Sequence, residues 1–210
     1  TYNTFKKYKS LTKKKIKLQY NGFNALEIKT KVGSVKPFNE RYNIITLSGR
    51  LDQKVKGLDV FLSAVNLVEL SNWKINLYGG NYDAVLRMVK EKINEKSIEK
   101  ISVFGTVPYE QLYNGLNNSK IYVLSSYADG MPLAVVEAMA LGNVIICADH
   151  YGMSVALKGG ELGRLFRIGD SEKLASILQQ TINDNSYLEE TFTKSVKYTW
   201  DNYSWESIIK

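Results

Sequence analysis

The sequence contains little cysteine, histidine or proline: its 210 residues include one Cys, one His and three Pro. The single cysteine, Cys147, excludes a disulfide within the chain, and its apolar neighbours in VIICA predict a buried core thiol. His150 is the sole histidine, and we expect it to be a polar loop residue rather than a ligand. Without a His and Cys cluster or an Asp-x-Asp motif, no metal is expected.

Long apolar runs and nucleotide fingerprints of the common kinds are also missing. No stretch approaches the roughly 20 apolar residues of a transmembrane helix, and no signal-peptide pattern opens the chain. The motif G-x-G-x-x-G is absent, which argues against a dinucleotide-dependent oxidoreductase. These absences favour a cytoplasmic protein with one domain, and a first residue other than Met suggests a piece of a longer chain.

Acidic residues are scarce at the front of the chain. Residues 1–40 contain ten lysines against Glu27 and Glu40, whereas residues 41–210 contain eighteen basic and nineteen acidic side chains. A nucleic-acid-binding protein more often spreads basic residues over a folded face among aromatics, so no nucleic acid is expected as a partner. The segment KKYKSLTKKKIK is either a solvated stretch or a contact with an anionic membrane surface, which would place the protein peripherally at the inner membrane face.

From residue 42 onward, strand patterns alternate with helical patterns. Strands are predicted at 42–48, 73–80, 101–105, 120–126, 143–148 and 162–167, and helices at 58–70, 82–95, 108–116, 132–141, 171–183, 186–198 and 203–210. This alternation predicts an α/β fold with a parallel sheet and helices on both faces. Residues 1–40 do not follow the pattern, so we predict a basic linker or remnant there and one domain at 41–210.

Candidate site residues follow the predicted strands, because ligands of such sheets gather beyond the carboxyl ends of the strands. After the first strand, Gly49 permits a sharp turn, and Arg50 and Lys56 carry cations suited to a diphosphate. The alternative is ordinary surface charge in a polar loop. Gly79 in YGG and the segment FGTVP follow the next two strands, where glycine lets a flat group approach the backbone.

The stretch SSYADGMPLAVVEAMALGNVIICA contains a helix that is apolar except at Glu137. Pro132 lies in its first turn, so the free N–H groups around 130–134 can bind an anion. Asp129 stands at the mouth of this helix, and Glu137, a turn and a half further in, would face the same crevice. A carboxylate there suits the vicinal hydroxyls of a ribose. The alternatives are a buried ion pair for Glu137 and a helix cap for Asp129.

Together these motifs resemble glycosyltransferase family 4, the group 1 glycosyltransferases. The pattern is Gly-Arg-Leu after the first strand, Lys-Gly six residues after that arginine, Phe-x-Gly-x-Val after the third strand, and acid-Gly-x-Pro-Leu-x-x-x-Glu-Ala-Met-Ala-x-Gly at 129–142. The resemblance covers about residues 42–210 and implies the C-terminal, donor-binding, Rossmann-like half of the GT-B fold. The chain departs from the family at Asp129, where Glu is usual, and at Val155, where an acid is frequent.

The resemblance implies a retaining glycosyltransferase of the hexosyltransferase type that uses a UDP- or GDP-linked sugar in bacterial surface polysaccharide synthesis. It implies Arg50 and Lys56 on the diphosphate, Glu137 on the ribose, and Asp129 with the following amides on the transferred sugar. The implied catalytic residues are Arg50, Lys56, Asp129 and Glu137. The implied donor-binding residues are Gly49, Arg50, Lys56, Gly79, Thr106, Val107, Gly130, Met131, Pro132, Leu133 and Glu137, with Thr106 and Val107 framing the base.

The N-terminal acceptor-binding domain of this family is missing, and only residues 15–24 resemble its last strand and exit. We therefore expect three partners: a nucleotide sugar, a glycan or lipid-linked acceptor, and that N-terminal domain. No resident cofactor is implied, and the chain alone should be inactive. The alternative is a non-catalytic nucleotide-binding or protein-interaction module, which would bind a nucleotide sugar without turnover.

Overall fold

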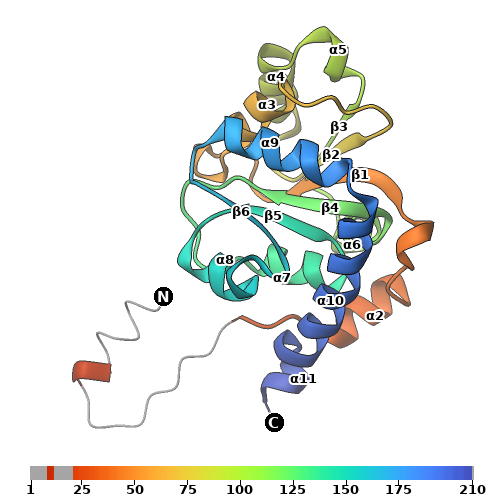
Figure 1. Cartoon of the computed structure of the whole chain (residues 1–210), viewed down its shortest axis with the longest axis vertical. Coiled ribbons are helices and arrows are strands. Elements are labelled where there is room, and N and C mark those ends of the chain that lie inside the picture. Colours follow the sequence, from red (N-terminus) through yellow and green to blue (C-terminus); the bar gives the residue numbers. More distant parts are fainter. Residues whose placement is uncertain (1–8, 12–20, 210) are drawn as a thin grey trace.

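A computed structural model of the chain describes residues 9–11 and 21–209 and contains one six-stranded parallel sheet. The strands run in the order β3-β2-β1-β4-β5-β6 (Figure 1). They are β1 (Tyr42–Ser48), β2 (Lys74–Tyr78), β3 (Ile101–Gly105), β4 (Ser119–Leu124), β5 (Val144–Ala148) and β6 (Gly163–Phe166). The order reverses between β1 and β4, and such a switch point is where doubly wound sheets bind ligands. The predicted α/β fold is confirmed.

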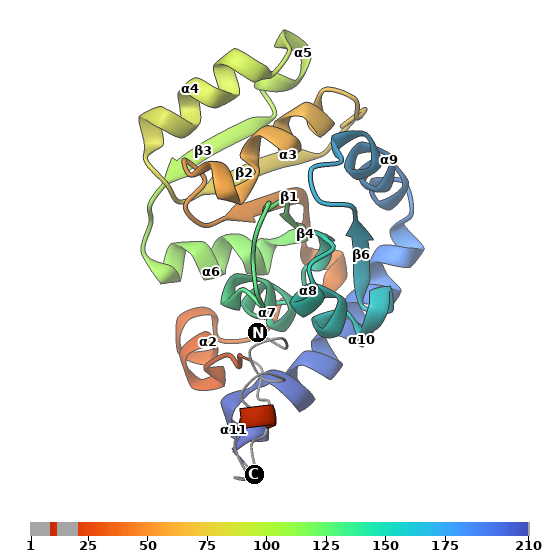
Figure 2. The ribbon, with the colours of Figure 1, turned by 90° about the vertical axis from the view of Figure 1, so that its left-hand side faces the viewer.

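Helices cover both faces of the sheet, as Figures 1 and 2 show. They are α2 (Ala25–Val32), α3 (Leu58–Val65), α4 (Tyr82–Lys92), α5 (Glu95–Ile98), α6 (Tyr109–Asn118), α7 (Leu133–Ala140), α8 (Tyr151–Ala156), α9 (Ser171–Ile182), α10 (Asn185–Tyr203) and α11 (Trp205–Ile208). Helices α3, α4 and α9 pack in one apolar cluster, and α2, α6, α7 and α8 pack in the other. All five residues of β5 are buried between the two layers, which explains the continuous apolar run VIICA.

Two predicted helices end earlier than their apolar patterns suggest. Helix α3 ends at Val65, although Leu70 is still buried, because the chain continues in turns in which the Leu67 and Val68 amides donate to carbonyls three residues earlier. Helix α4 ends at Lys92 because Ile93 is extended. Asn94 then accepts a hydrogen bond from the Ser97 amide and starts the short helix α5.

Residues 21–40 pack against the sheet domain through α2 and the short 3-10 helix at Phe38–Glu40. Phe23 and Ile28 are each only 1% exposed, and the ring of Phe23 meets that of Trp200 edge-on at 5.1 Å. The Phe23 amide donates to the Tyr203 carbonyl, which ties this segment to the end of α10. The domain boundary near residue 40 stays a prediction, and residues 15–20 lie outside the described residues.

Arg41 fastens the amino end of the sheet to both neighbouring helices. Its guanidinium donates to the carbonyls of Ser119 at 3.0 Å and Leu141 at 2.6 Å, and it lies 4.9 Å from the Phe192 ring centre. Arg41 is 4% exposed, and burial lowers the pKa of its guanidinium to about 10. Backbone carbonyls take the place of a counter-ion, so this arginine is a structural anchor.

Candidate functional site

A pocket of about 640 Å³ opens at the carboxyl ends of β1, β2 and β3 and extends to the start of α7. Its lining residues are Ser48, Gly49, Arg50, Lys56, Tyr78, Gly79, Gly80, Thr106, Val107, Tyr109, Leu112, Pro132, Leu133 and Ala134. Eight of these are residues that the sequence predicts as donor-binding: Gly49, Arg50, Lys56, Gly79, Thr106, Val107, Pro132 and Leu133. The other predicted residues, Asp129, Gly130, Met131 and Glu137, are not among those that line it.

Glycine at two positions is required by backbone packing around the pocket. Gly79 has a φ of 91°, and a Cβ there would lie 2.1 Å from the Gly49 carbonyl oxygen. Gly57 has a φ of 65°, and a Cβ there would lie 2.0 Å from the Ser125 carbonyl oxygen. A side chain at either glycine would push the two contacting backbone segments apart. The wall of the pocket at the strand ends is therefore formed by close-packed backbone.

The loops after β1 and β4 are joined by several hydrogen bonds. The Ser125 hydroxyl donates to the Gly57 carbonyl at 2.8 Å, and the Tyr127 amide donates to the Val55 carbonyl at 2.8 Å. The Tyr127 hydroxyl donates to the Asp59 carboxylate at 2.9 Å. These bonds hold the two loops that carry Lys56 and Asp129 against each other.

Lys56 and Asp129 form an ion pair across these loops, with 2.9 Å between Nζ and Oδ2. Their side chains are 20% and 16% exposed, so the pair is partly shielded from water. Asp129 does not cap α7, because Pro132 occupies the N-cap position and no side chain caps that helix. The helix-cap alternative for Asp129 is therefore wrong. Within the described part of the chain, Arg50 makes no ion pair and no side-chain hydrogen bond.

Helix α7 presents its amino end to the pocket through Pro132, Leu133 and Ala134. The first amides of a helix have no intrahelical acceptor, and the helix dipole favours an anion there. Gly130 and Met131 belong to the loop before the helix, where the Met131 carbonyl accepts a hydrogen bond from Asn21. The pocket thus combines the cations Arg50 and Lys56 with a helix amino end.

Glu137 lies inside α7 and is 8% exposed. Its Oε1 accepts a hydrogen bond of 2.7 Å from the Tyr113 hydroxyl. Burial raises the pKa of the Glu137 carboxyl, the bond from Tyr113 lowers it in part, and the charge of Glu27 raises it further. No lysine or arginine of the described chain forms an ion pair with Glu137, so the ion-pair alternative for this residue is wrong.

His150 lies in the loop between β5 and α8, as predicted, and its side chain is buried there. It is 9% exposed at the start of α8, and its Nε2 lies 2.8 Å from the Ser126 carbonyl oxygen. The loop sequence before α8 is polar, but the tertiary contact with the end of β4 covers the ring. His150 therefore has a structural partner in the segment that precedes Asp129.

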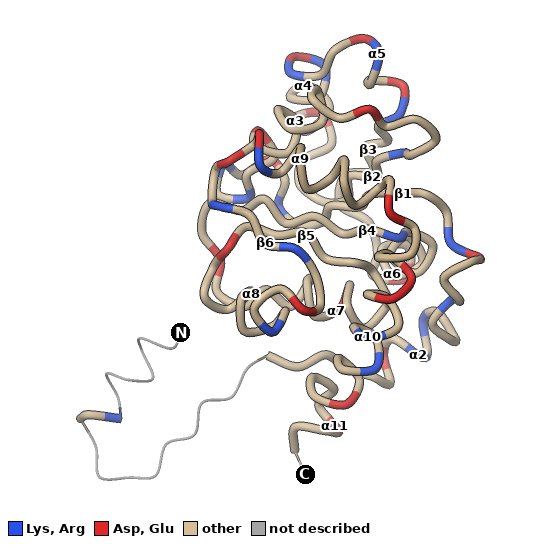
Figure 3. Tube along the Cα trace, in the orientation of Figure 1, with Lys and Arg blue, Asp and Glu red and all other residues tan. Residues whose placement is uncertain are grey.

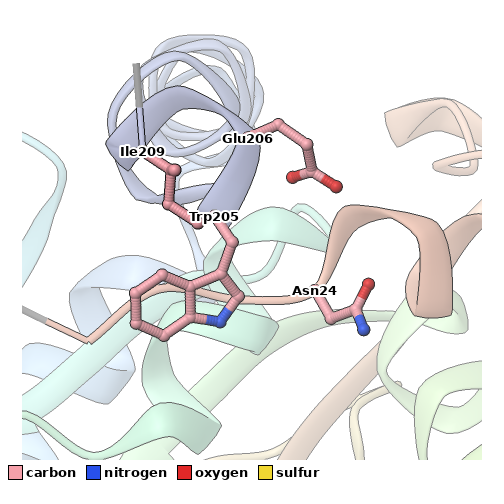
Figure 4. Close-up of a pocket in the computed structure, with 4 residues that line it drawn as sticks. All are labelled: Asn24, Trp205, Glu206 and Ile209. Atoms are coloured by element: carbon pink, nitrogen blue, oxygen red, sulfur yellow. The ribbon is translucent and has the colours of Figure 1, made fainter.

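A second pocket, of about 470 Å³, is lined by Asn24, Trp205, Glu206 and Ile209 (Figure 4). It lies where the segment before α2 meets α11, and no predicted site residue lines it. On the described part of the chain, lysines, arginines and acids are interspersed over the helices on both sides of the sheet (Figure 3). Of the helices in that part, none is long and apolar enough to cross a membrane.

The strand order and the pocket at the switch point define a Rossmann-like α/β domain. Residues 29–197 match the family described as "Glycosyl transferases group 1". The chain belongs to this family, and the resemblance found in its motifs is confirmed.

Curated relatives are similar to the chain over part of their length. An uncharacterized 41.2 kDa protein in the cps region of Klebsiella pneumoniae is 26% identical over 187 residues, which is 84% of this chain and 49% of that protein. The amylovoran biosynthesis glycosyltransferase AmsK of Erwinia amylovora is 27% identical over 136 residues, which is 61% of this chain and 33% of that protein. The chain spans half or less of the length of either relative.

Solved structures share the fold at low sequence identity. TarM of S. aureus, determined with fondaparinux, α-GlcNAc-glycerol and UDP, superimposes with a TM-score of 0.75 and 19% identity, covering 100% of this chain and 41% of TarM. HepE of Anabaena, determined with UDP-glucose, superimposes with a TM-score of 0.71 and 18% sequence identity. The match covers 90% of this chain and 53% of HepE. These likenesses confirm the Rossmann-like half of a GT-B glycosyltransferase as the fold.

Proposed function

We propose that this chain binds a UDP- or GDP-linked sugar as the donor domain of a retaining hexosyltransferase. The observation that carries the proposal is the pocket itself, which brings Arg50, Lys56 and the amino end of α7 together at the switch point of the sheet. Family membership and the UDP-glucose named with the HepE structure support a nucleotide sugar as the ligand.

In this proposal, Arg50, Lys56 and the first amides of α7 bind the diphosphate. Arginine gives a planar, bidentate contact to phosphate, and lysine adds a compact charge. As the bond to the sugar breaks, negative charge grows on the leaving diphosphate, and fixed positive groups stabilise that charge. Because Lys56 is paired with Asp129, we expect a bound diphosphate to compete with that carboxylate for the ammonium group.

The remaining predicted residues complete the donor site. Glu137 accepts hydrogen bonds from the ribose hydroxyls, and the backbone near Thr106 and Val107 frames the base. Asp129, freed from Lys56, and the amides of Gly130 and Met131 hold the transferred sugar. No metal or resident cofactor takes part in this scheme.

We assign the whole enzyme to bacterial surface polysaccharide synthesis, with a glycan or lipid-linked acceptor. The names of two relatives support this: AmsK in amylovoran biosynthesis and WcaL in colanic acid biosynthesis. The acceptor and the catalytic base would come from an N-terminal domain. A cytoplasmic location fits a nucleotide-sugar donor, with the lysine-rich segment 6–17, which is mostly outside the described residues, touching an anionic inner membrane face.

Titration calorimetry and thermal shift with UDP, GDP, ADP and their sugars test the proposal. We expect one nucleoside diphosphate to bind and to raise the melting temperature, as a ligand specific for the folded state must. Absence of binding by every nucleotide in the panel would refute the donor-site assignment. Binding without turnover by the longer enzyme that contains an acceptor domain would instead favour the non-catalytic module.

A further inference from the structure

The buried contact between Tyr113 and Glu137 connects two helices next to the pocket. Tyr113 on α6 is 2% exposed and donates its hydroxyl to Glu137 Oε1 on α7. Within the described part of the chain, the other carboxyl oxygen, Oε2, has no hydrogen-bond or ion-pair partner. One oxygen of the carboxyl is thus fixed by the protein and the other is available.

The contact lies one helical turn behind the pocket wall. Tyr109 on α6 and Ala134 on α7 line the pocket. Tyr113 is four residues after Tyr109, and Glu137 is three residues after Ala134, so each lies on the same helix face as the lining residue. The ring of Tyr113 also meets that of Tyr109 edge-on at 5.7 Å. The hydrogen bond between Tyr113 and Glu137 therefore joins α6 and α7 directly behind the two residues with which these helices line the pocket.

A buried carboxyl without a cation is a costly group for a helix that is otherwise apolar. Burial raises the pKa of the Glu137 carboxyl, and the Tyr113 hydroxyl opposes this by donating to the charged form. The same bond restricts the rotation of the carboxyl group. Both effects prepare Glu137 to accept hydrogen bonds through Oε2.

We propose that Tyr113 is a positioning residue for donor binding: it fixes Oε1 of Glu137 so that Oε2 accepts from the ribose of the nucleotide. The proposal rests on the proposed function, because the ribose contact of Glu137 belongs to that function. Tyr113 itself touches no donor atom in this arrangement. Its removal should therefore weaken only the part of the affinity that depends on ribose.

The decisive experiment compares the Tyr113→Phe variant with the wild-type chain in binding of UDP, GDP and inorganic pyrophosphate. Phenylalanine keeps the ring contact with Tyr109 and removes only the hydroxyl. We expect roughly tenfold weaker binding of the nucleoside diphosphate, the size expected for a hydrogen bond to a charged group. Pyrophosphate has no ribose, so its affinity should be unchanged. The matched control is Tyr203→Phe, which removes a buried tyrosine hydroxyl at the end of α10.

A double-mutant cycle and a pH profile separate positioning from a structural effect. Tyr113→Phe should cost no further affinity in a Glu137→Ala background, because alanine leaves no carboxyl group for the hydroxyl to fix. The titratable groups that interact with Glu137 are Glu27 on α2, Tyr113 on α6 and Tyr122 on β4. Nucleotide affinity should fall as Glu137 becomes protonated at low pH, and this fall should move to higher pH in Tyr113→Phe.

A second variant avoids any loss of folding. Replacing Tyr113 alone by 3-fluorotyrosine keeps the shape of the side chain and makes its hydroxyl a stronger donor. The pH at which nucleotide affinity falls should then move lower. The inference is overturned if Tyr113→Phe binds UDP and GDP like the wild type, or if pyrophosphate affinity drops equally. A wild-type chain that binds no nucleotide would overturn the proposed function and this inference with it.

Discussion

Lys56 Nζ and Asp129 Oδ2 lie 2.9 Å apart, although 73 residues separate them in the chain. Lys56 lines the pocket, whereas Asp129, in the loop after β4, is not among the residues that line it. Asp129 thus competes for the lysine with any anion that enters. Arg50 has no such competitor among the described residues. The two cations of the pocket are therefore unequal: Arg50 has no ionic partner among the described residues, whereas Lys56 already contacts a carboxylate.

The first prediction is that Asp129→Asn tightens the binding of free UDP or GDP. Asparagine removes the competing charge, and a partly shielded ion pair of about 1 kcal/mol corresponds to about a fivefold gain in affinity. Calorimetry at low ionic strength measures the change. The control is Glu69→Gln, which breaks the exposed Lys96–Glu69 pair away from the pocket and should alter nothing. An unchanged affinity in Asp129→Asn would show that the ion pair does not oppose ligand binding.

Removal of either cation should weaken nucleoside-diphosphate binding. Arg50→Ala and Lys56→Ala should each cost about 1–3 kcal/mol, because each removes a charged hydrogen bond to phosphate. Lys54→Ala is the matched control, since Lys54 belongs to the same short 3-10 helix as Lys56 but does not line the pocket. Titration curves of both variants that overlay the wild-type curve would remove these residues from the site.

Glu137→Gln should lower nucleotide affinity without unfolding the chain. An amide is a weaker acceptor than a carboxylate for the ribose hydroxyls, and burying it costs less than burying a charge. Because burial raises the pKa of Glu137, the folded state binds its proton more tightly than the unfolded state. The free energy of unfolding of the wild type should therefore fall as pH rises from about 4, near the unfolded carboxyl pKa, through the raised pKa.

Urea unfolding of both proteins at several pH values measures this difference. Glu137→Gln should lack the part of the pH dependence that comes from residue 137, and its stability relative to the wild type should increase towards neutral pH. Identical pH dependence in the two proteins would contradict the raised pKa. Full nucleotide affinity in Glu137→Gln would leave the carboxyl without a role in the donor site.

Arg41→Lys should destabilise the fold and spare the pocket. Lysine cannot reach the carbonyls of Ser119 and Leu141 together, so buried acceptors lose their donors, at a cost of about 2–4 kcal/mol. The urea midpoint should decrease, while nucleotide affinity of the folded protein stays the same. Arg87→Lys, an exposed change on α4, provides the comparison. A midpoint equal to that of the wild type would mean that Arg41 is not the anchor of this end of the sheet.

This chain alone should bind donor nucleotide and transfer little or no sugar. The acceptor and the catalytic base belong to the other domain in the proposed enzyme, and positioning with exclusion of water accounts for many kcal/mol of a barrier. A sugar-transfer assay on the 210-residue chain, run beside the binding titration, tests both statements. Robust transfer by the chain alone would contradict the two-domain proposal.

The sequence predicted the sheet well because buried parallel strands are short, continuous apolar runs. Strands β1 and β3 have the predicted bounds, and eight predicted residues meet in one pocket. Helix ends were less predictable, since Asn94 begins a new helix where the apolar pattern continues. The packing of Phe23 depends on Trp200, which is too distant in the chain for periodicity to reveal.

The contacts made by the site residues could not be predicted from sequence. Tyr113 reads as an ordinary core position of an amphipathic helix, and only the fold brings its hydroxyl to Glu137. The pairing of Lys56 with Asp129 likewise depends on how the two loops cross. The sequence pattern predicts that Lys56 and Asp129 follow the ends of strands. It does not predict which side chains they contact, because tertiary packing determines those contacts.

The bonds that join the loops after β1 and β4 also bear on how a ligand is bound. Gly57 and Ser125 are in contact through the backbone, and Tyr127 reaches both Val55 and Asp59. These loops are therefore ordered before any ligand arrives, and little conformational entropy remains to be lost when one binds. Loops that are held together in this way favour a ligand whose shape fits them. A nucleotide of a different shape would bind more weakly, because the loops would not adjust to it.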